Sequence, residues 1–381
     1  CQNAIRFCIR RPVLNVAGWT GVRDAHDSHD AGGRRMTGSR GHLTLLGVCT
    51  AILVLIAFYY ARVLLAPVVF ALFAIAVVWP LQSLLQARIP KLIAVAITVL
   101  VIVVVVTTLA ALIGWGFGRA TRWLLADLGR FQAMYLQAAA WLEQHGFVLT
   151  GVFGEIFNTS SIVAMVQRVG SRLQSMASFS VVALIFTILG LLEVDAVAAK
   201  LRGLSNQALG ESLVRAGAQT AKKLQKYMRV RTVMSVMTGI LVYAFAKAIG
   251  LPLAAEWGVI AFALNYIPFI GSFVATLAPT LFAFAQFESW EMALFVFACL
   301  NLIQFVVGSY LEPRVAGTAL SISPFVVLFA VFLWSFLWGI AGAFIGVPIV
   351  IAILTVCEQY PASRWVSQVL AGTDGEAGEA A

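Results

Sequence analysis

Residues 92–114 read LIAVAITVLVIVVVVTTLAALIG and carry no charged side chain. A helix needs about 20 consecutive apolar residues to cross the hydrocarbon core of a bilayer. The many Val and Ile residues also suit a β-strand, but a lone segment in lipid must satisfy its own backbone hydrogen bonds, which only a helix does. This stretch therefore predicts a transmembrane helix.

The whole chain has the composition of a membrane protein. Of its 381 residues, 61% are hydrophobic and 11% are charged, whereas soluble domains are about 45–50% apolar and about 25% charged. One globule cannot bury that much apolar surface, which excludes cytosolic enzymes, disordered proteins and disulfide scaffolds. We expect an all-α, polytopic helical membrane protein of about eight spans.

The remaining apolar segments set the other spans. They lie at about 43–61, 63–79, 177–192, 233–249 and 291–310, with two longer stretches at 253–287 and 324–357. We expect the second span to end at Pro80.

Each long stretch exceeds one crossing and is interrupted by Gly and Pro. The breaks are Pro268, Gly271 and Pro279 in 253–287, and Gly339, Gly342 and Pro348 in 324–357. Each stretch is either a helical hairpin or one bent span with a partial one. Interrupted helices survive in membranes where protein or a cavity satisfies the freed backbone groups, and paired ones point to a transport site. The alternative is a kinked helix with no special role.

Two polar, helix-like inserts interrupt the spans, at 118–175 and 193–231. The insert 193–231 has eight basic and three acidic residues, and 118–175 has five and three. Because cytoplasmic loops carry the excess of Lys and Arg, we place 193–231 in the cytoplasm, 118–175 outside, and both termini in the cytoplasm.

The ends differ from the apolar body. We expect 1–41 to be a disordered basic leader, 42–358 the transporter domain, and 359–381 a disordered tail. Met36 opens a short basic segment before the first span, so 1–35 is interpreted as a start-site artefact. The alternative is a lipoprotein-type Cys1 exposed by processing.

The sequence lacks the motifs of enzymes. It has no Walker loop, no H-E-x-x-H, no Cys/His cluster and no G-x-S-x-G, and no histidine lies in a span. We therefore expect no catalytic residue, no metal and no cofactor. The basic charge has no accompanying aromatic motif, so nucleic-acid binding is not expected.

Few polar groups lie within the apolar segments. Glu312 precedes Pro313, and it either pairs with Arg314 or an arginine elsewhere, or lines a pathway. A charge inside a membrane is expensive and usually functional. The amides of Asn265 and Gln304 are either contacts between helices or contacts to a substrate.

Several motifs together resemble the autoinducer-2 exporter family of bacterial membrane permeases. They are Asn265-Tyr-Ile-Pro268-Phe-Ile-Gly271, Glu312-Pro313-Arg314-Val-Ala-Gly317, Leu320-Ser-Ile-Ser-Pro324, and Gly339-Ile-Ala-Gly342 with Gly346-Val-Pro348. The order of spans fits the same family from about 42 to 358.

The resemblance implies an eight-span permease of the bacterial inner membrane that forms homo-oligomers. Some relatives are associated with export of autoinducer-2, and others with sodium(lithium)/proton antiport. We expect a secondary transporter exporting a small polar metabolite or signal of this type. The alternatives are a sodium(lithium)/proton antiporter and a non-transporting membrane scaffold. The expected partners are the solute, protons or sodium, and the bilayer.

The broken helices suggest a mechanism. Carbonyls freed near Pro268 and Pro313 would bind a solute or cation, and Asn265 and Gln304 would add directional hydrogen bonds. The glycines either allow close backbone approach or act as hinges. The pathway residues are thus Asn265, Pro268, Gly271, Gln304, Glu312, Pro313 and Gly317. The hinge or close-packing residues are Pro324, Gly339, Gly342 and Pro348.

Overall fold

A computed structural model describes residues 31–126, 159–316, 322–360 and 363–370, together with residues 129, 140 and 144. The chain divides into two units, Cys1–Ala57 and Phe58–Ala381. Within the first unit, the described residues belong to the first helix. All contacts discussed below lie within the second unit.

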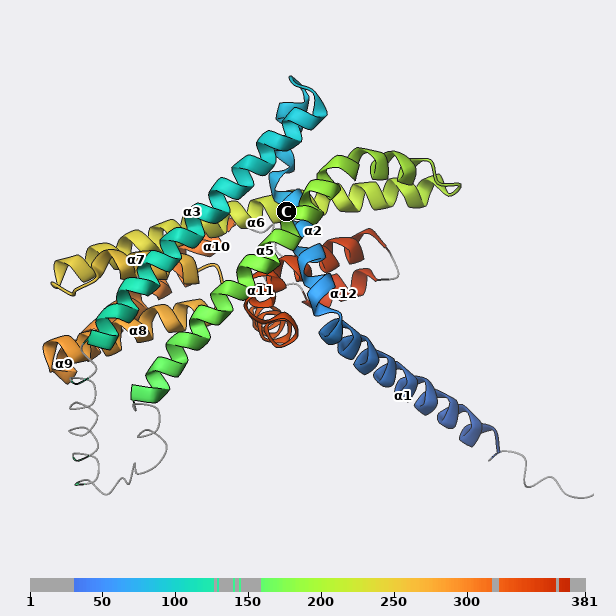
Figure 1. Ribbon diagram of the computed structural model, residues 1–381. Helices are drawn as coiled ribbons and strands as arrows, with labels where there is room; N and C mark the ends of the chain where they lie inside the picture. The colour runs from blue at the N-terminus through green and yellow to red at the C-terminus, as the bar shows by residue number, and fades with distance from the viewer. Residues whose placement is uncertain are drawn as a thin grey trace, which may run out of the picture. The chain divides into compact units, whose positions relative to one another are not determined.

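The described residues are helical almost throughout (Figure 1). The helices are α1 Ala31–Tyr60, α2 Arg62–Gln86, α3 Lys91–Ala126, α5 Thr159–Arg202, α6 Gln207–Ala248, α7 Ala254–Leu264, α8 Ile270–Phe287, α9 Trp290–Phe305, the π-helical turn η1 Val306–Leu311, α10 Glu312–Ala316, α11 Pro324–Gln359 and α12 Arg364–Leu370.

Among the described residues, seven helices are long and apolar enough to cross a membrane. The predicted first span, 43–61, coincides with a shorter apolar helix, Leu45–Tyr60. α1 itself begins at Ala31, within the segment for which the sequence predicts a disordered leader. The protein is an all-α, multi-pass membrane protein, as predicted.

The prediction that the second span ends at Pro80 is wrong, because α2 continues to Gln86. Proline lacks the N–H that would bond the carbonyl four residues earlier, that of Ala76. Gln225 of α6 replaces it, since its Nε2 donates to the Ala76 carbonyl at 2.7 Å. A neighbouring helix thus satisfies the group that proline leaves free, as it must in lipid.

The polar inserts are extensions of the spans. α3 runs unbroken to Ala126, and α5 joins the second half of insert 118–175 to the predicted span 177–192. The rest of that insert, apart from three isolated residues, lies outside the described residues. The insert 193–231 is divided between α5 and α6, where Asn206 caps α6 by accepting from the Leu209 N–H at 3.1 Å.

The apolar stretch 253–287 is a helical hairpin. α7 and α8 are separated by residues 265–269, and Phe269 adopts the left-handed φ of 61°. Trp257 near the start of α7 meets Phe282 in the second half of α8, with ring centroids 5.3 Å apart. A Cβ at Gly271 would lie on the carbonyl of Leu264, so the two helices run antiparallel from a turn that only glycine permits.

The second long stretch, within α11, is also a hairpin. Gly339 breaks the helix with φ 66° and ψ −143°. A Cβ on Gly342 would meet the Trp334 carbonyl, and one on Gly346 would lie 3.0 Å from the Ala330 carbonyl. These pairs are symmetric about the break, so the two halves fold back on each other. Unbroken, 36 residues would extend about 54 Å, well beyond a bilayer core.

α6 is the helix on which these elements assemble. Figure 1 shows α6, α7 and α8 side by side. α6 and α7 cross at Gly239 and Gly258, where a Cβ on either would lie 2.8–2.9 Å from the other's carbonyl oxygen. Small residues allow such close helix contacts in membranes. In the part of α6 that precedes this crossing, Leu224 and Tyr227 pack against α11.

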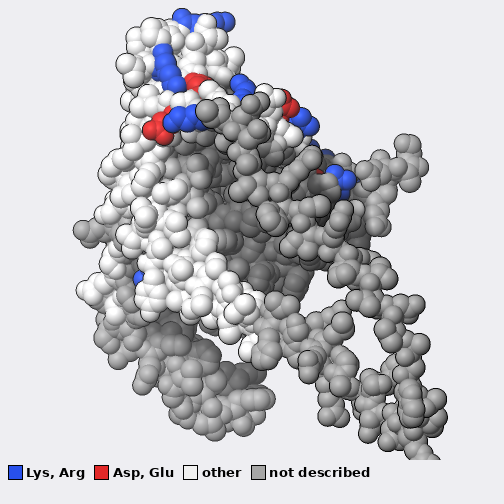
Figure 2. All heavy atoms as spheres, turned by 90° about the vertical axis from the view of Figure 1, so that its right-hand side faces the viewer, with Lys and Arg blue, Asp and Glu red and all other residues white. Residues whose placement is uncertain are grey.

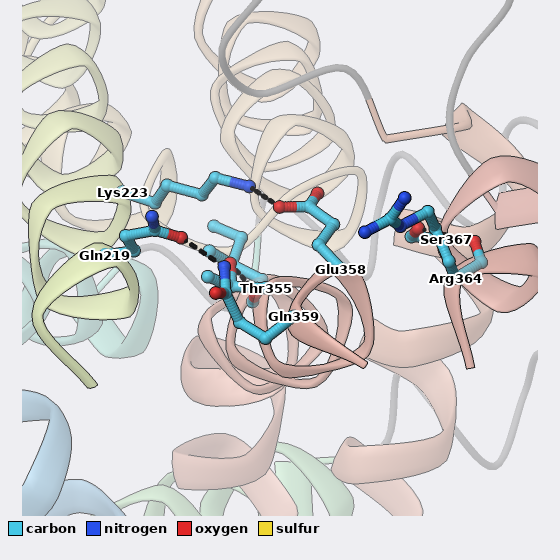
Figure 3. A network of polar contacts seen from close by, with 8 residues as sticks. Gln219, Lys223, Thr355, Glu358, Gln359, Arg364 and Ser367 are labelled. Carbon is cyan, nitrogen blue, oxygen red and sulfur yellow. Dashed lines mark hydrogen bonds and ion pairs between the residues drawn. The ribbon is translucent and has the colours of Figure 1, made fainter. Parts of the chain in front are cut away.

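Polar side chains join the end of α11 to α6. Figure 3 shows Lys223 and Gln219 of α6 reaching Glu358 and Gln359. The Lys223–Glu358 ion pair measures 2.7 Å, and Gln359 Nε2 lies 2.5 Å from Gln219 Oε1. This polar junction fixes the hairpin of α11 along the basic part of α6.

Part of the predicted disordered tail is ordered, because residues 364–370 form α12. The Ser363 hydroxyl donates to the Cys357 carbonyl at 3.1 Å, which ties the start of α12 to the end of α11. The Ser323 N–H donates to the Leu370 carbonyl at 3.2 Å. α12 therefore joins the two ends of the α11 hairpin, a pairing distant in sequence that composition alone does not reveal.

Charge is unevenly distributed over the surface. On the face in Figure 2, the described Lys, Arg, Asp and Glu side chains gather toward one end, and most of the remaining described surface is uncharged. A largely uncharged surface with charge gathered at one end suits a protein that crosses a bilayer.

Candidate functional site

An ion pair joins two elements that the sequence alone does not connect. Arg231 of α6 donates from Nη1 to Glu312 Oε1 at 2.8 Å and to Oε2 at 2.9 Å. The side chain of Arg231 is 8% exposed and that of Glu312 is 26% exposed. The arginine is thus the buried, fixed partner, and the carboxylate is the more accessible one.

One helical turn further along α6, the break of the α7–α8 hairpin is held by a second polar contact. Asn265, the C-cap residue that follows α7, donates from Nδ2 to the Ser235 hydroxyl at 3.2 Å, and both residues are buried. Residues four apart lie on the same face of a helix. Arg231 and Ser235 therefore bring Glu312 and Asn265 to adjacent turns of one α6 face.

The neighbouring residue of the break makes a further contact with α6. The Tyr266 hydroxyl bonds the Thr232 hydroxyl at 3.1 Å. Two successive residues of the broken hairpin are thus hydrogen-bonded to α6. We call Arg231, Ser235, Asn265 and Glu312 the α6 site.

A π-helical turn positions Glu312. η1 follows α9 and leads into α10, whose first residue is Glu312. Val307 of this turn is buried against Val230 and Met234 of α6, which brings the following carboxylate to Arg231. Single π turns within helices occur often at functional sites.

The structure decides between the predicted partners of Glu312. Its partner is an arginine of another segment, because Arg314 lies over the Tyr310 ring with its guanidinium carbon 3.9 Å from the ring centroid. Pro313 follows directly in α10. The Glu312 carboxylate at the start of α10 therefore pairs with α6.

The other predicted pathway residues are distributed as follows. Pro268 lies in the α7–α8 turn, where its carbonyl accepts from the Ile270 N–H at 2.7 Å. Gly271 is the close-packing position of that turn. Gln304 lies on α9, and its buried Nε2 has no hydrogen-bond partner among the described residues. Gly317 lies outside the described residues.

The predicted hinge or packing residues belong to a separate element. Pro324 is the first residue of α11, Gly339 is its break, and Gly342 is a close-packing position. Pro348 is buried in the second half. No described contact joins these four residues to the α6 site. The Gly and Pro breaks of 253–287 and those of 324–357 therefore belong to two separate hairpins.

Sequence reasoning missed Arg231 and Ser235. Arg231 ends the basic insert 193–231, and the charge pattern identifies it only as a cytoplasmic charge. The available signal was its place at the boundary of the apolar segment 233–249, four residues before Ser235. An arginine directly before a span requires a partner if it is buried.

A buried carboxylate outside the α6 site was also missed. Glu256, in the first turn of α7, forms an ion pair with Arg119 of α3, with 2.9 Å between Nε and Oε1. The Glu256 side chain is 4% exposed and that of Arg119 is 49% exposed. This pair lies at the opposite end of α7 from Asn265, so ion or amide contacts fix both ends of that short helix.

In the described part of the chain, no group of three or more His, Cys, Asp or Glu side chains is placed to hold a metal ion. The α6 site instead combines one buried cation, one partly exposed carboxylate, an amide and a hydroxyl. Such a set can hydrogen-bond a small polar molecule and exchange one charged partner for another.

Comparison with known proteins places this arrangement in a family. The model of the AI-2E family transporters matches residues 48–362. The chain is similar to the AI-2 transport protein TqsA of Escherichia coli (strain K12), 26% identical over 85% of this chain and 94% of that protein. It is also 24% identical to an inferred transport protein of Haemophilus influenzae, over 84% of this chain and 93% of that one.

A third relative, an inferred transport protein of Borreliella burgdorferi, is 32% identical over 40% of this chain and 42% of its own length. The matched region of the family covers both broken hairpins and the α6 site. The chain is a membrane transporter that belongs to the AI-2E family.

Proposed function

We propose that the chain is a secondary transporter that exports a small polar solute of the autoinducer-2 type. The α6 site carries this proposal, because two interrupted helical elements place Asn265 and Glu312 against adjacent turns of α6. Interrupted helices in transporters supply backbone and side-chain groups to the solute site. The name of the similar Escherichia coli protein adds support.

In this mechanism the solute is held by neutral groups beside a charged pair. Asn265 and Ser235 bond each other at 3.2 Å, and both can exchange that bond for one to a solute hydroxyl or carbonyl. The hairpin turn at Gly271 and the π turn before Glu312 are the elements that move. The protein operates in the bacterial inner membrane with both termini in the cytoplasm, and assembles as a homo-oligomer.

Solute flux in proteoliposomes tests the proposal. Vesicles containing the protein are loaded with autoinducer-2, a proton gradient is imposed, and efflux is followed for wild type, Asn265→Ala and Glu312→Gln. We expect gradient-dependent efflux in wild type and a loss of at least tenfold in both variants. Asn301→Ala is the matched control, because Asn301 is exposed and its Nδ2 donates to the Phe297 carbonyl of its own helix.

Efflux that persists unchanged in Asn265→Ala, with normal expression and assembly, would refute the assigned site. Absence of efflux from wild type would refute the assigned solute.

The second candidate is a sodium(lithium)/proton antiporter. The observation that favours it is the single carboxylate of the α6 site, because Glu312 could alternate between a proton, a cation and Arg231. Sodium-driven proton movement that Glu312→Gln abolishes, with no autoinducer-2 efflux, would establish this candidate.

A further inference from the structure

Arg231 has more hydrogen-bonding capacity than Glu312 uses. A guanidinium carries five N–H donors and stays charged at all relevant pH values. Both contacts to Glu312 come from Nη1. The Nε atom is buried and has no hydrogen-bond partner among the described residues.

The part of α6 that precedes Arg231 is basic. Along α6, Arg215, Lys222, Lys226 and Arg229 precede it, whereas Glu211 is the one acidic residue of that helix. Lys223 is paired with Glu358. Clustered like charge raises the local concentration of counter-ions and speeds their arrival. An anion therefore reaches this end of the site more readily than a cation does.

We propose that Arg231 is the binding group for an oxyanion carried by the transported solute, and that Glu312 is the internal anion which occupies it between transport events. This inference rests on the proposed function, since it names the substrate class of the same site. The solute displaces the Glu312 carboxylate from Nη1 and takes the Nη1 and Nη2 donors as a bidentate pair, a geometry that suits carboxylate, phosphate and similar groups. Ser235 and Asn265, one turn away, hydrogen-bond the neutral part of the solute.

Competition by Glu312 has a measurable consequence. If the carboxylate occupies Arg231 for about 90% of the time, the apparent affinity for an external oxyanion is reduced about tenfold. Removing the charge of Glu312 lifts that competition. Glu312→Gln should thus bind an oxyanion about tenfold more tightly than wild type, although it loses transport.

Sulfate is a suitable probe because it stays dianionic throughout the usable pH range. Calorimetric titration of the purified full-length protein with sulfate, at ionic strength held constant with sodium chloride, gives the dissociation constants. We expect weak binding to wild type, binding about tenfold tighter to Glu312→Gln, and none to Arg231→Gln. Lys223→Gln is the control, because that lysine belongs to the α6–α11 junction, and its dissociation constant should equal that of wild type.

A folding defect in Arg231→Gln does not prevent the test. The double variant Arg231→Gln/Glu312→Gln removes both charges together, leaves no unpaired ion, and is expected to fold and to bind no sulfate. Equal sulfate binding by wild type and Glu312→Gln, or binding retained in the double variant, would overturn the proposal.

The oxyanion of a lipid headgroup has the same chemistry, and a second titration separates the two sources. Short-chain phosphatidylglycerol replaces sulfate. Arg231-dependent binding of the lipid without binding of sulfate would contradict a solute site. Loss of autoinducer-2 efflux with intact, Arg231-dependent sulfate binding would refute the proposed solute alone. Normal efflux without sulfate binding would refute the inference alone.

Discussion

The Arg231–Glu312 pair predicts an asymmetry in stability between its two single variants. At 2.8 Å and an effective dielectric constant of about 20, the attraction is about 6 kcal/mol before desolvation, and desolvation of both ions offsets most of it. Glu312→Leu leaves Arg231 charged at 8% exposure, so we expect the free energy of unfolding to fall by about 3–5 kcal/mol.

Arg231→Met leaves Glu312, whose side chain is 26% exposed. Water or a proton can then compensate the carboxylate, so we expect a smaller loss of about 2–3 kcal/mol. The double variant Arg231→Met/Glu312→Leu leaves no ion behind. Its loss should be under about 2 kcal/mol, which gives a coupling energy of at least about 3 kcal/mol.

Unfolding in mixed micelles with increasing detergent denaturant, followed by tryptophan fluorescence, measures all four proteins. The Lys223–Glu358 pair is the matched control, because its side chains are 31% and 42% exposed and such pairs couple by less than about 1 kcal/mol. If the Arg231 and Glu312 effects add within about 0.5 kcal/mol, or Arg231→Met is the more damaging variant, the assigned burial and pairing are refuted.

Three further variants test the packing. Gly339→Ala forces an alanine into φ 66° and ψ −143° and should cost about 1–3 kcal/mol in the same unfolding assay, whereas Gly114→Ala, with open space at its Cβ, should be neutral or stabilising. Gly258→Ala places a methyl group 2.8 Å from a carbonyl oxygen of α6 and should cost about 1–3 kcal/mol; no loss would mean that α6 and α7 are farther apart. Arg119→Met leaves Glu256 buried and unpaired and should cost about 3–5 kcal/mol, more than Glu256→Gln, which frees a half-exposed arginine; the reverse order would contradict the burial of Glu256.

The membrane spans could be predicted from sequence because lipid imposes one length and one kind of structure. Segment 92–114 satisfies both conditions by itself, and it lies within α3. The end of the second span could not be predicted, because continuation through Pro80 depends on Gln225, which is 149 residues from the carbonyl it bonds. Local rules for proline do not include a donor from another helix.

The sequence allowed either helical hairpins or bent spans for the two long apolar stretches. The glycines explain why both stretches form hairpins. Gly271 and Gly342 each lie directly against a carbonyl of the preceding helix. The sequence marks such positions as breaks, but a break alone does not give the angle between two helices. The angle follows from packing, as between Trp257 and Phe282.

Two of the four residues of the α6 site could be predicted from the sequence. Asn265 and Glu312 stood out because polar groups are rare in apolar segments. Their partners on α6 did not, since Ser235 is a common small residue and Arg231 belongs to a run of basic residues. Only the packing of η1 and α7 on α6 shows that these four residues meet.

In the proposed mechanism solute passes the contact between Ser235 and Asn265, and modification of a single cysteine tests this directly. Ser235→Cys is placed in a background in which the native cysteines are serine, and its reaction with a charged thiol reagent is measured in proteoliposomes during transport. Ser235 is 0% exposed in this conformation, and so is Thr98 of α3, so Thr98→Cys is the matched control. We predict that the thiol of the Ser235→Cys variant reacts during transport and is protected by excess solute, whereas the thiol of the Thr98→Cys variant does not react. No reaction in either variant, or equal reaction in both, would contradict a pathway at the α6 site.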